Sequence, residues 1–252
     1  VMKLRIRTKD LIYHALDALF CKKNYNLSHP ELLCFTTVIV MIKMEGDIND
    51  TLGRQVADEI GAEYEHLDVR NSDQWANVVQ RHHFTDGVLN AGAGARFNDL
   101  REVSDDTLET VLDTNLLGIM IGTRELFRSM ADRGGAISVT SSIAGLVAHT
   151  QSPVYAASKW GTIGWVRSIA TSLAQSGVII NAVCPGLVDT PILGPGGGDA
   201  MRKMGLKVLA AAEVATAHLD SLLHTEPGTV FTVQAEVPVG IHESKSIAGY
   251  QG

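Results

Sequence analysis

The sequence predicts a single α/β domain in which a doubly wound parallel sheet carries helices on both of its faces. From about residue 46 to residue 235, short apolar segments rich in β-branched residues alternate with helical patterns of ten or more residues. This alternation is typical of parallel β-α units. Polar residues and glycines recur just after the apolar segments. With 252 residues, 45% of them hydrophobic, the chain can form one large domain.

The helices and strands can be placed in order from Gly46 onward. Apolar spacing and capping residues predict five helices, at 51–62, 71–83, 103–130, 153–175 and 211–223. Gly61 marks the end of the first. Short apolar segments predict five strands, at 63–69, 86–89, 135–142, 177–186 and 229–234. We expect 229–234 to be the last strand of the sheet. Residues 90–94 indicate a glycine-rich turn, and residues 187–210 a flexible loop that covers the substrate.

Residues 1–46 differ from the rest because they contain no glycine before Gly46, their last residue, although the chain has 24. Residues 2–7 could form a short strand, and residues 10–23 have apolar side chains at helical spacing. Residues 31–44 are apolar and β-branched at their centre, which indicates either a buried strand or a buried helix. The segment could therefore supply a β-α-β unit.

Composition and charge exclude several kinds of function. A net charge of −7 argues against a large nucleic-acid surface. The three cysteines show neither metal-ligand spacing nor a disulfide framework, which predicts a cytoplasmic protein without a metal site. The apolar run at 38–42 is too short to span a membrane, and no cleavage pattern marks a targeting peptide. We therefore expect no nucleic-acid or membrane partner.

Tyr155 and Lys159 are the candidate catalytic pair. They stand four residues apart, at a spacing that places both on one face of a helix. Tyrosine ionises at about pH 10 unaided, and a nearby ammonium favours the phenolate, so the pair suggests proton transfer. Ser142 lies upstream, across a turn-like segment from which its hydroxyl could reach Tyr155. The alternative is a surface helix on which this common spacing has no function.

The strand ends carry the other candidate residues. In doubly wound sheets, ligands bind beyond the carboxyl ends of the strands. Such ends are expected at Asp47, Asp68, 90–94, Ser142 and 185–190. Their shared location favours a functional role for Tyr155 and Lys159.

Taken together, these segments resemble the short-chain dehydrogenase/reductase family over about residues 46–235. The resemblance is carried by NAG at 90–92, DTNLLG around Asn115, the serine pair at 141–142, YAASK at 155–159 and PGLVDT at 185–190. It implies a Rossmann-like domain that acts as a NAD-dependent oxidoreductase on a small-molecule secondary alcohol or ketone. It also implies a homotetramer or a homodimer.

The resemblance implies a role for each catalytic candidate. Tyr155 would be the general acid/base, and Lys159 would lower the pKa of Tyr155 and hold the nicotinamide ribose. Ser142 would donate a hydrogen bond to the substrate oxygen, with Ser141 as the competing choice. Asn115 would bind water through its side chain in a relay to Lys159.

The cofactor-binding candidates follow from the same resemblance. Asp47 would accept hydrogen bonds from the adenosine ribose and repel a 2′-phosphate, which favours NAD over NADP; a plain helix-capping role is the alternative. Asp68 and Val69 would bracket the adenine. The remaining candidates, expected to bring backbone or side chains close to the cofactor, are Asn90, Ala91, Gly92, Pro185, Gly186, Val188 and Thr190, together with Tyr155 and Lys159.

The family's phosphate-binding turn, TGxxxGxG, has no counterpart in this sequence. It should fall near residues 22–29, which read KKNYNLSH. One explanation is a shifted reading frame or altered exon, and the abrupt return of family-like sequence at Gly46 favours it. A divergent segment that still builds β-α-β is the second. The third is a loss of cofactor binding, which would leave a non-catalytic binding or scaffold protein of the same fold.

Overall fold

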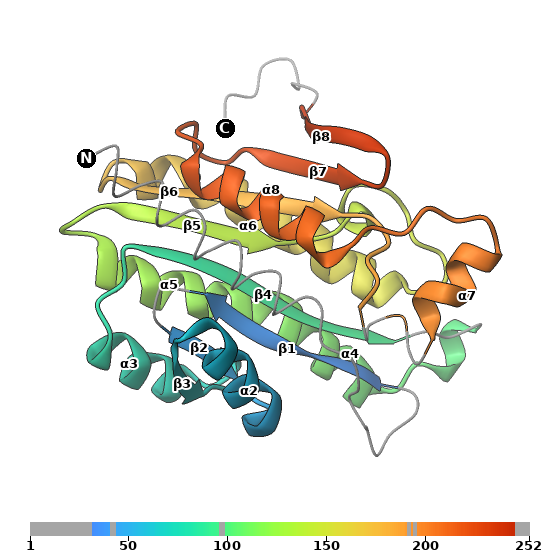
Figure 1. Cartoon of the computed structure of the whole chain (residues 1–252), viewed down its shortest axis with the longest axis horizontal. Helices are drawn as coiled ribbons and strands as arrows, with labels where there is room; N and C mark the ends of the chain where they lie inside the picture. Colours follow the sequence, from blue (N-terminus) through green and yellow to red (C-terminus); the bar gives the residue numbers. More distant parts are fainter. Residues whose placement is uncertain (1–31, 41–43, 96–98, 191–192, 194–195, 245–252) are drawn as a thin grey trace.

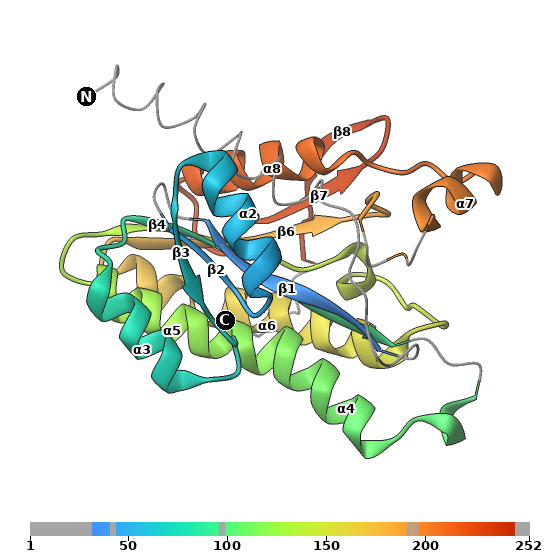
Figure 2. The same cartoon turned by 60° about the horizontal axis from the view of Figure 1, so that its bottom comes forward.

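The computed structural model describes residues 32–40, 44–95, 99–190, 193 and 196–244. The strand expected at 2–7, the helix expected at 10–23 and the phosphate-binding turn expected at 22–29 lie outside these residues. The described chain forms a twisted sheet between two layers of helices (Figures 1 and 2). No helix in this part of the chain is long and apolar enough to cross a membrane.

The main sheet has six strands in the order β1-β4-β5-β6-β7-β8. Their bounds are Leu32–Val40 (β1), Asp86–Ala95 (β4), Gly135–Thr140 (β5), Val178–Pro185 (β6), Val230–Gln234 (β7) and Val237–Ile241 (β8). β4 to β7 are parallel, whereas β1 and β8 run antiparallel to their neighbours. The doubly wound α/β fold is confirmed, with one correction: the described sheet is mixed rather than purely parallel.

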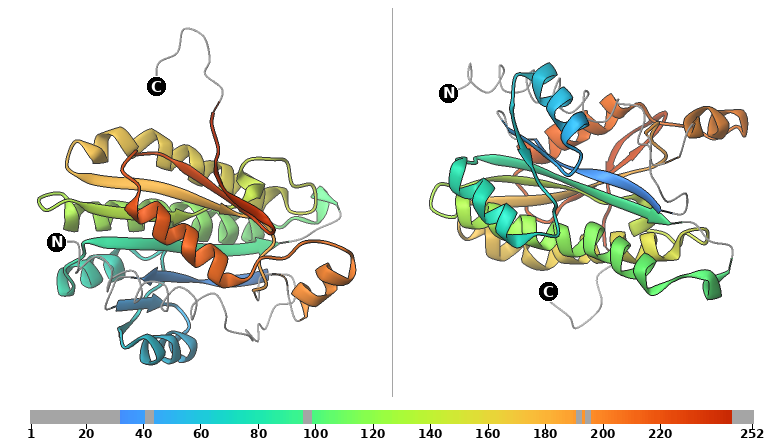
Figure 3. Two further views of the ribbon diagram at one scale, coloured as in Figure 1. Left: turned by 45° about the horizontal axis from the view of Figure 1, so that its top comes forward. Right: turned by 90° about the horizontal axis from the view of Figure 1, so that it is seen from below.

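A second, two-stranded sheet lies beside β1. It pairs β2 (Met44–Asp47) with β3 (Glu63–His66) in parallel, and α2 (Asp50–Ile60) connects them. α2 begins at the cap residue Asn49 and ends at Gly61, whose φ of 67° is the left-handed conformation that glycine adopts readily. The small sheet lies at the edge of the main sheet opposite β8 (Figure 3).

Two apolar clusters, one on each face of the main sheet, form most of the core. Leu89 of β4 and Ile137 of β5 pack with α3 (Ser72–Arg81), α5 (Gly118–Met130) and α6 (Pro153–Ala174). Val88 and Val183 point to the other face and pack with α8 (Ala211–Leu223). Neighbouring strand residues thus face opposite helix layers, which is how a sheet buried on both sides is stabilised.

The long helix expected at 103–130 is divided into three parts. Ser104 caps α4 (Asp105–Leu112) as predicted, a π-helical turn follows at Asp113–Leu117, and α5 continues the helix. π-helical turns inside α-helices often occur at functional sites. Asn115, a candidate catalytic residue, lies within this turn.

Three strand predictions need correction. Residues 31–44 include the strand β1, so the alternative of a buried helix is wrong for 32–40. The turn expected at 90–94 belongs to β4, because β1 pairs with this segment through Leu33–Gly94 and Phe35–Gly92. β7 is not the last strand, because β8 follows after a tight turn in which Glu236 has a φ of 65°.

Candidate active site

α6 presents Tyr155 and Lys159 in its first two turns. The helix begins at Pro153, whose fixed φ suits the first helical position. The hydroxyl of Ser152, just before the helix, donates to the carbonyl oxygen of Ala95 at 2.5 Å and ties this end of α6 to β4. The Lys159 Nζ lies 5.7 Å from the centre of the Tyr155 ring. The four-residue spacing therefore brings the two side chains together.

The Lys159 ammonium bridges β4 and β5 where the two strands separate. The last residue pair of their ladder is Leu89 with Val139. Just beyond it, the Nζ donates to the carbonyl oxygens of Ala91 at 2.8 Å and Thr140 at 3.2 Å. The side chain is only 2% exposed, and burial lowers the pKa of Lys159 to about 8. The ammonium thus connects the diverging strand ends at the carboxyl edge of the sheet.

The side chain of Ser142 faces the Tyr155 phenol, whereas that of Ser141 bonds to α6. Ser142 follows β5, and its Oγ accepts a hydrogen bond from the Ala144 N–H at 3.1 Å while its side chain also bonds to Tyr155. The Ser141 hydroxyl donates to the main-chain oxygen of Lys159 at 2.9 Å. Of the two adjacent serines, Ser142 is therefore the one whose side chain bonds to the candidate acid/base.

The pKa of Tyr155 shifts in the direction opposite to the one expected. Burial raises the pKa of the phenol, and its hydrogen bond with Ser142 opposes only part of that rise. The Lys159 ammonium was expected to lower it. It lies beside the ring instead and donates to two carbonyl oxygens, so desolvation of the phenol dominates.

Asn115 connects the π-helical turn to β4 and α6. Its Oδ1 accepts a hydrogen bond from the Ala93 N–H at 2.5 Å, and its Nδ2 donates to the Ala93 carbonyl at 2.8 Å and to the Ser158 Oγ at 3.0 Å. The side chain is fully buried. These contacts favour a positioning role over the expected water relay, because protein atoms already occupy both ends of the amide.

Asp47 ends β2 as predicted, but its carboxyl group is buried. One oxygen accepts the Asn49 N–H at 2.5 Å, and the residue is only 3% exposed. Burial raises the pKa of Asp47 to about 7, an effect that the Asn49 bond opposes and the charge of Asp50 reinforces. The group is therefore partly protonated near neutral pH.

Glu45 lies two residues earlier on β2, so its side chain projects from the same face as that of Asp47. It is fully buried, and within the described structure neither carboxyl oxygen has a hydrogen-bond partner. Burial, reinforced by the charge of Asp47, raises the pKa of Glu45 to about 9. An acidic residue two positions before Asp47 was the only signal in the sequence, and we did not predict its burial.

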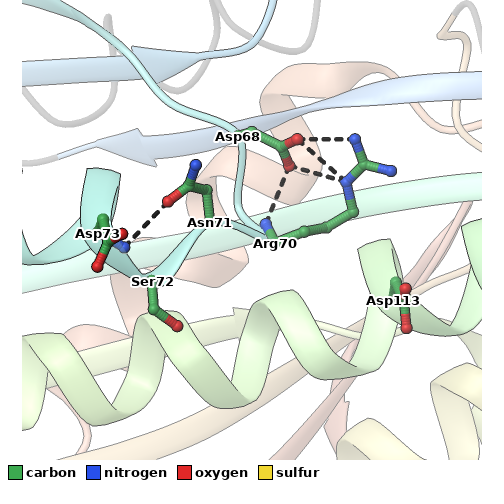
Figure 4. A pocket seen from close by; sticks show the side chains of 6 residues that line it. All are labelled: Asp68, Arg70, Asn71, Ser72, Asp73 and Asp113. Atoms are coloured by element: carbon green, nitrogen blue, oxygen red, sulfur yellow. Dashed lines mark hydrogen bonds and ion pairs between the residues drawn. The ribbon is translucent and has the colours of Figure 1, made fainter.

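Asp68 borders an open pocket of about 450 Å³ beyond β3. The lining residues belong to the β3–α3 loop, the start of α3 and the π-helical turn: Asp68, Arg70, Asn71, Ser72, Asp73 and Asp113 (Figure 4). The Arg70 guanidinium donates hydrogen bonds of 2.7–3.1 Å to both carboxylate oxygens of Asp68. Val69 instead packs in the core, where its carbonyl accepts the Trp75 indole N–H at 3.0 Å. Of the two residues expected at the adenine, only Asp68 lines the pocket.

The segment Asn90–Gly92 lies within β4. β1 pairs with it through Val38–Asn90 and Phe35–Gly92, and the Ala91 carbonyl receives Lys159. The structure therefore uses this backbone for the sheet and for the lysine, rather than opening it as the expected turn.

The two ends of the expected substrate-covering loop, residues 187–210, pair with each other. Pro185 ends β6, and the Gly186 N–H donates to the Val233 carbonyl at 2.8 Å. Val188 forms a bridge with Leu209, so that the segment leaves and rejoins the body of the protein side by side. A short helix, α7 (Gly197–Lys203), lies between these points, and Thr190 bonds to the Val188 carbonyl before it.

Cys184 is a buried thiol beside the catalytic candidates that sequence reasoning did not single out. Burial raises the pKa of the thiol to about 11, and this rise is opposed by contacts with Ser141 and Ser142 and by the Lys159 charge. Its position directly before Pro185 was the available signal.

Comparison with known proteins places these features in a wider group. A family model described as short chain dehydrogenase matches residues 36–197. The 3-alpha-(or 20-beta)-hydroxysteroid dehydrogenase of Mycobacterium bovis is 35% identical over 155 residues, which are 58% of this chain and 59% of the relative. The 15-hydroxyprostaglandin dehydrogenase [NAD(+)] of Mus musculus is 44% identical over 91 residues, 35% of this chain and 34% of that protein. This chain thus spans at most about three-fifths of these relatives' length.

Solved structures show the same fold. A 3-oxoacyl-[acyl-carrier protein] reductase with bound NAD from Brucella melitensis matches with a TM-score of 0.67 and 25% identity. The match covers 76% of this chain and 79% of the other. A further structure, ElxO with NADP bound, matches with a TM-score of 0.63 and 22% identity over 73% of this chain and 80% of that one.

Proposed function

Because the chain belongs to the short-chain dehydrogenase family, we propose that it is an oxidoreductase that interconverts a secondary alcohol and a ketone with NAD. The observation that carries the proposal is the convergence of Ser142, Tyr155 and Lys159, with the Lys159 Nζ 5.7 Å from the centre of the Tyr155 ring. All three residues lie where ligands bind in doubly wound sheets, at the carboxyl edge.

The donor set at this edge fits the reactive end of a nicotinamide cofactor. A phenol, a hydroxyl and an ammonium stand together where β4 and β5 separate, and the carbonyls of Ala91 and Thr140 hold the ammonium there. When bound, the nicotinamide would supply or accept the hydride. The residues that would hold the cofactor are Asp47, Asp68, Asn90, Ala91, Gly92, Lys159, Pro185, Gly186, Val188 and Thr190.

In the proposed reaction, Tyr155 exchanges a proton with the substrate oxygen. In reduction, the phenol donates its proton to the carbonyl oxygen; in oxidation, the phenolate takes a proton from the alcohol. Ser142 donates a hydrogen bond to the same oxygen as negative charge develops there. Burial raises the pKa of Tyr155, so the phenol is protonated at neutral pH and can act as the proton donor in reduction.

The proposed preference for NAD depends on the ionisation of Asp47. A carboxylate at the end of β2 repels a 2′-phosphate, whereas a protonated acid does not. Because the pKa of Asp47 is about 7, discrimination against NADPH should strengthen as the pH rises through 7. Titrations of NADH and NADPH on both sides of pH 7 would measure this. An equal ratio of the two affinities at both pH values would contradict it.

Hydroxysteroids and hydroxylated lipids are the proposed first substrates to assay. Two relatives are named for a hydroxysteroid and for 15-hydroxyprostaglandin, both of which carry a secondary alcohol on an apolar frame. We further propose that the chain forms one domain in which residues 187–210 cover this substrate. The buried free thiol of Cys184 supports a cytoplasmic location.

Fluorescence titration with NADH would separate the proposed enzyme from the alternative, a non-catalytic binding or scaffold protein. Absence of binding at millimolar NADH would favour the scaffold. If NADH binds, Tyr155→Phe should reduce turnover by about 100-fold or more while leaving NADH affinity unchanged, because only the proton donor is lost. Undiminished turnover in this variant would refute the role of Tyr155.

We also propose a homodimer or homotetramer formed through the helices at 103–130 and 153–175. Large apolar side chains are exposed on them: Leu112 by 36%, Leu117 by 43% and Trp160 by 52%. Burial of such side chains between subunits would stabilise an assembly. Light scattering that gives only the monomer mass would contradict this.

A further inference from the structure

A buried polar cluster lies between α8 and β5, on the face of the sheet opposite Lys159. Its centre is His218 of α8, which is fully buried. The His218 Nδ1 lies 2.7 Å from the Ser138 Oγ, and the Nε2 lies 2.9 Å from the Thr140 Oγ1. Ser138 and Thr140 are two residues apart on β5, so one imidazole spans two neighbouring side chains on the same face of the strand.

The hydrogen bonds of the cluster show which atom donates and which accepts in each contact, and so assign the tautomer of His218. The Ser138 hydroxyl donates to the Ser221 Oγ at 2.8 Å. Ser138 must therefore accept from the Nδ1–H of His218, and the Nε2 accepts from the Thr140 hydroxyl. This is a neutral imidazole with both nitrogens bonded, consistent with burial that lowers the pKa of His218 to about 3.

Thr140 connects this cluster to the candidate active site. It is the last residue of β5 and lies beyond the final β4–β5 pair, Leu89 with Val139. On the β4 side, its carbonyl accepts the Lys159 Nζ at 3.2 Å instead of continuing a ladder. Ser142 follows two residues later. The side chain of Thr140 thus bonds to His218 of α8 on one face of the sheet. Its carbonyl accepts a hydrogen bond from Lys159, which comes from α6 on the opposite face.

We propose that His218 is a positioning residue: by holding the Thr140 hydroxyl it fixes the carbonyl that receives Lys159 and the strand end that carries Ser142. The effect of His218 on catalysis rests on the proposed function. The effect of His218 on Lys159 does not, because the contacts from His218 through Thr140 to Lys159 form without cofactor or substrate.

The test measures Lys159 directly. The full-length protein is labelled with [13C,15N]-lysine, the Lys159 signal is assigned with Lys159→Met, and its titration is followed by NMR. Two variants break the contact from either side: His218→Leu removes the imidazole, and Thr140→Val removes the hydroxyl while keeping the carbonyl and the side-chain shape. Met130→Ala, a fully buried residue beside the opposite end of β5, is the matched destabilised control.

Release of Thr140 should let water reach the ammonium, so the pKa of Lys159 should rise toward its ordinary value. We expect its proton affinity to increase by about tenfold in His218→Leu and in Thr140→Val. Met130→Ala should leave the titration unchanged. His218→Gln, which can still accept from the Thr140 hydroxyl, should restore most of the wild-type behaviour. An unchanged Lys159 titration in folded Thr140→Val would overturn the proposal, even if His218→Leu fails to fold.

A kinetic measurement separates this inference from the proposed function. If the wild-type protein turns over substrate, Thr140→Val should lower kcat more than it raises the KM for NADH, and should shift the pH profile of kcat in the same direction as the lysine titration. A changed lysine titration in a protein that never binds NADH would leave the positioning role standing and refute the oxidoreductase. A normal kcat and pH profile in Thr140→Val, in an active enzyme, would refute the catalytic consequence.

Discussion

Two carboxyl groups on one face of β2 show how tertiary burial changes single residues. Glu45 and Asp47 are both buried, and the pKa of each is raised mainly by loss of water. Tyr155 and Lys159 could be paired from the sequence because a four-residue helical spacing is a local property. The burial of Glu45 could not, because it depends on how α2 and β1 pack over the small sheet.

Glu45→Gln should stabilise the protein, and by more at higher pH. The pKa of Glu45 is raised from 4.5 to about 9, so its contribution to stability is fully present below 4.5 and is lost as the pH rises through 9. The isosteric amide cannot ionise, so the variant should gain up to about 1.4 kcal/mol per pH unit over the wild type within this range. Urea unfolding at several pH values would measure the difference.

Asp58→Asn is the control for that measurement, because it removes one negative charge from an exposed position on neighbouring α2. Its stability should follow the wild-type curve. If Glu45→Gln and the wild type gave parallel curves between pH 5 and 9, the Glu45 carboxyl would have to be solvated or paired in solution.

Among the elements, the interruption of the long helix at Asp113–Leu117 matters most for the site. The helical pattern over 103–130 correctly predicted its ends and the Ser104 cap, but the π-helical turn leaves the apolar periodicity nearly unchanged. Asn115 inside a helical pattern was the only local signal. Its contacts with Ala93 and Ser158, 22 and 43 residues away, exist only in the folded protein.

Strand edges were the least predictable elements for a similar reason. Residues 90–94 have the glycines of a turn, and they become part of β4 because β1 pairs with them. β8 alternates valine and isoleucine with Pro238 and Gly240 on an exposed edge, so its apolar pattern is short and weak. Buried central strands and amphipathic helices are encoded locally, whereas pairing at an edge depends on which segment comes to lie beside it.

Asn115→Ala should destabilise the protein by about 2–4 kcal/mol. The change removes the side chain that pairs with both the N–H and the carbonyl of Ala93, and these buried backbone groups would lose their partner. Urea denaturation monitored by circular dichroism would give the change in the free energy of unfolding. Asn77→Ala on the exposed face of α3 is the control and should stay within about 0.5 kcal/mol of the wild type. A similarly small effect for Asn115→Ala would show that water replaces the lost bonds.

For the molecule as a whole, buried titratable groups at the main sheet and in the small sheet respond to pH in opposite ways. His218 under α8 has a pKa lowered from 6.5 to about 3, and Glu45 and Asp47 in the small sheet have pKa values raised to about 9 and about 7. The doubly wound class was predictable because alternating β and α segments specify it. The location of these groups was not, since it requires knowing which strand face each helix covers.

The stability of the protein should therefore be greatest in mildly acidic solution and fall on both sides. Folding disfavours protonation of His218, so its contribution is fully present above pH 6.5 and is lost as the pH falls toward 3. Folding favours protonated Glu45, so stability falls as the pH rises from 4.5 toward 9. Folding also favours protonated Asp47, whose pKa is raised from 3.8 to about 7. Between pH 4.5 and 6.5 the losses from Glu45 and Asp47 together exceed the gain from His218, so the free energy of unfolding should already decline slowly there. Urea midpoints measured from pH 3 to 9 would reveal this profile. His218→Leu should change the profile only below pH 6.5, and Glu45→Gln should lessen the loss of stability only above pH 4.5. A changed profile above pH 7 in His218→Leu, or below pH 4 in Glu45→Gln, would show that the two groups do not act independently.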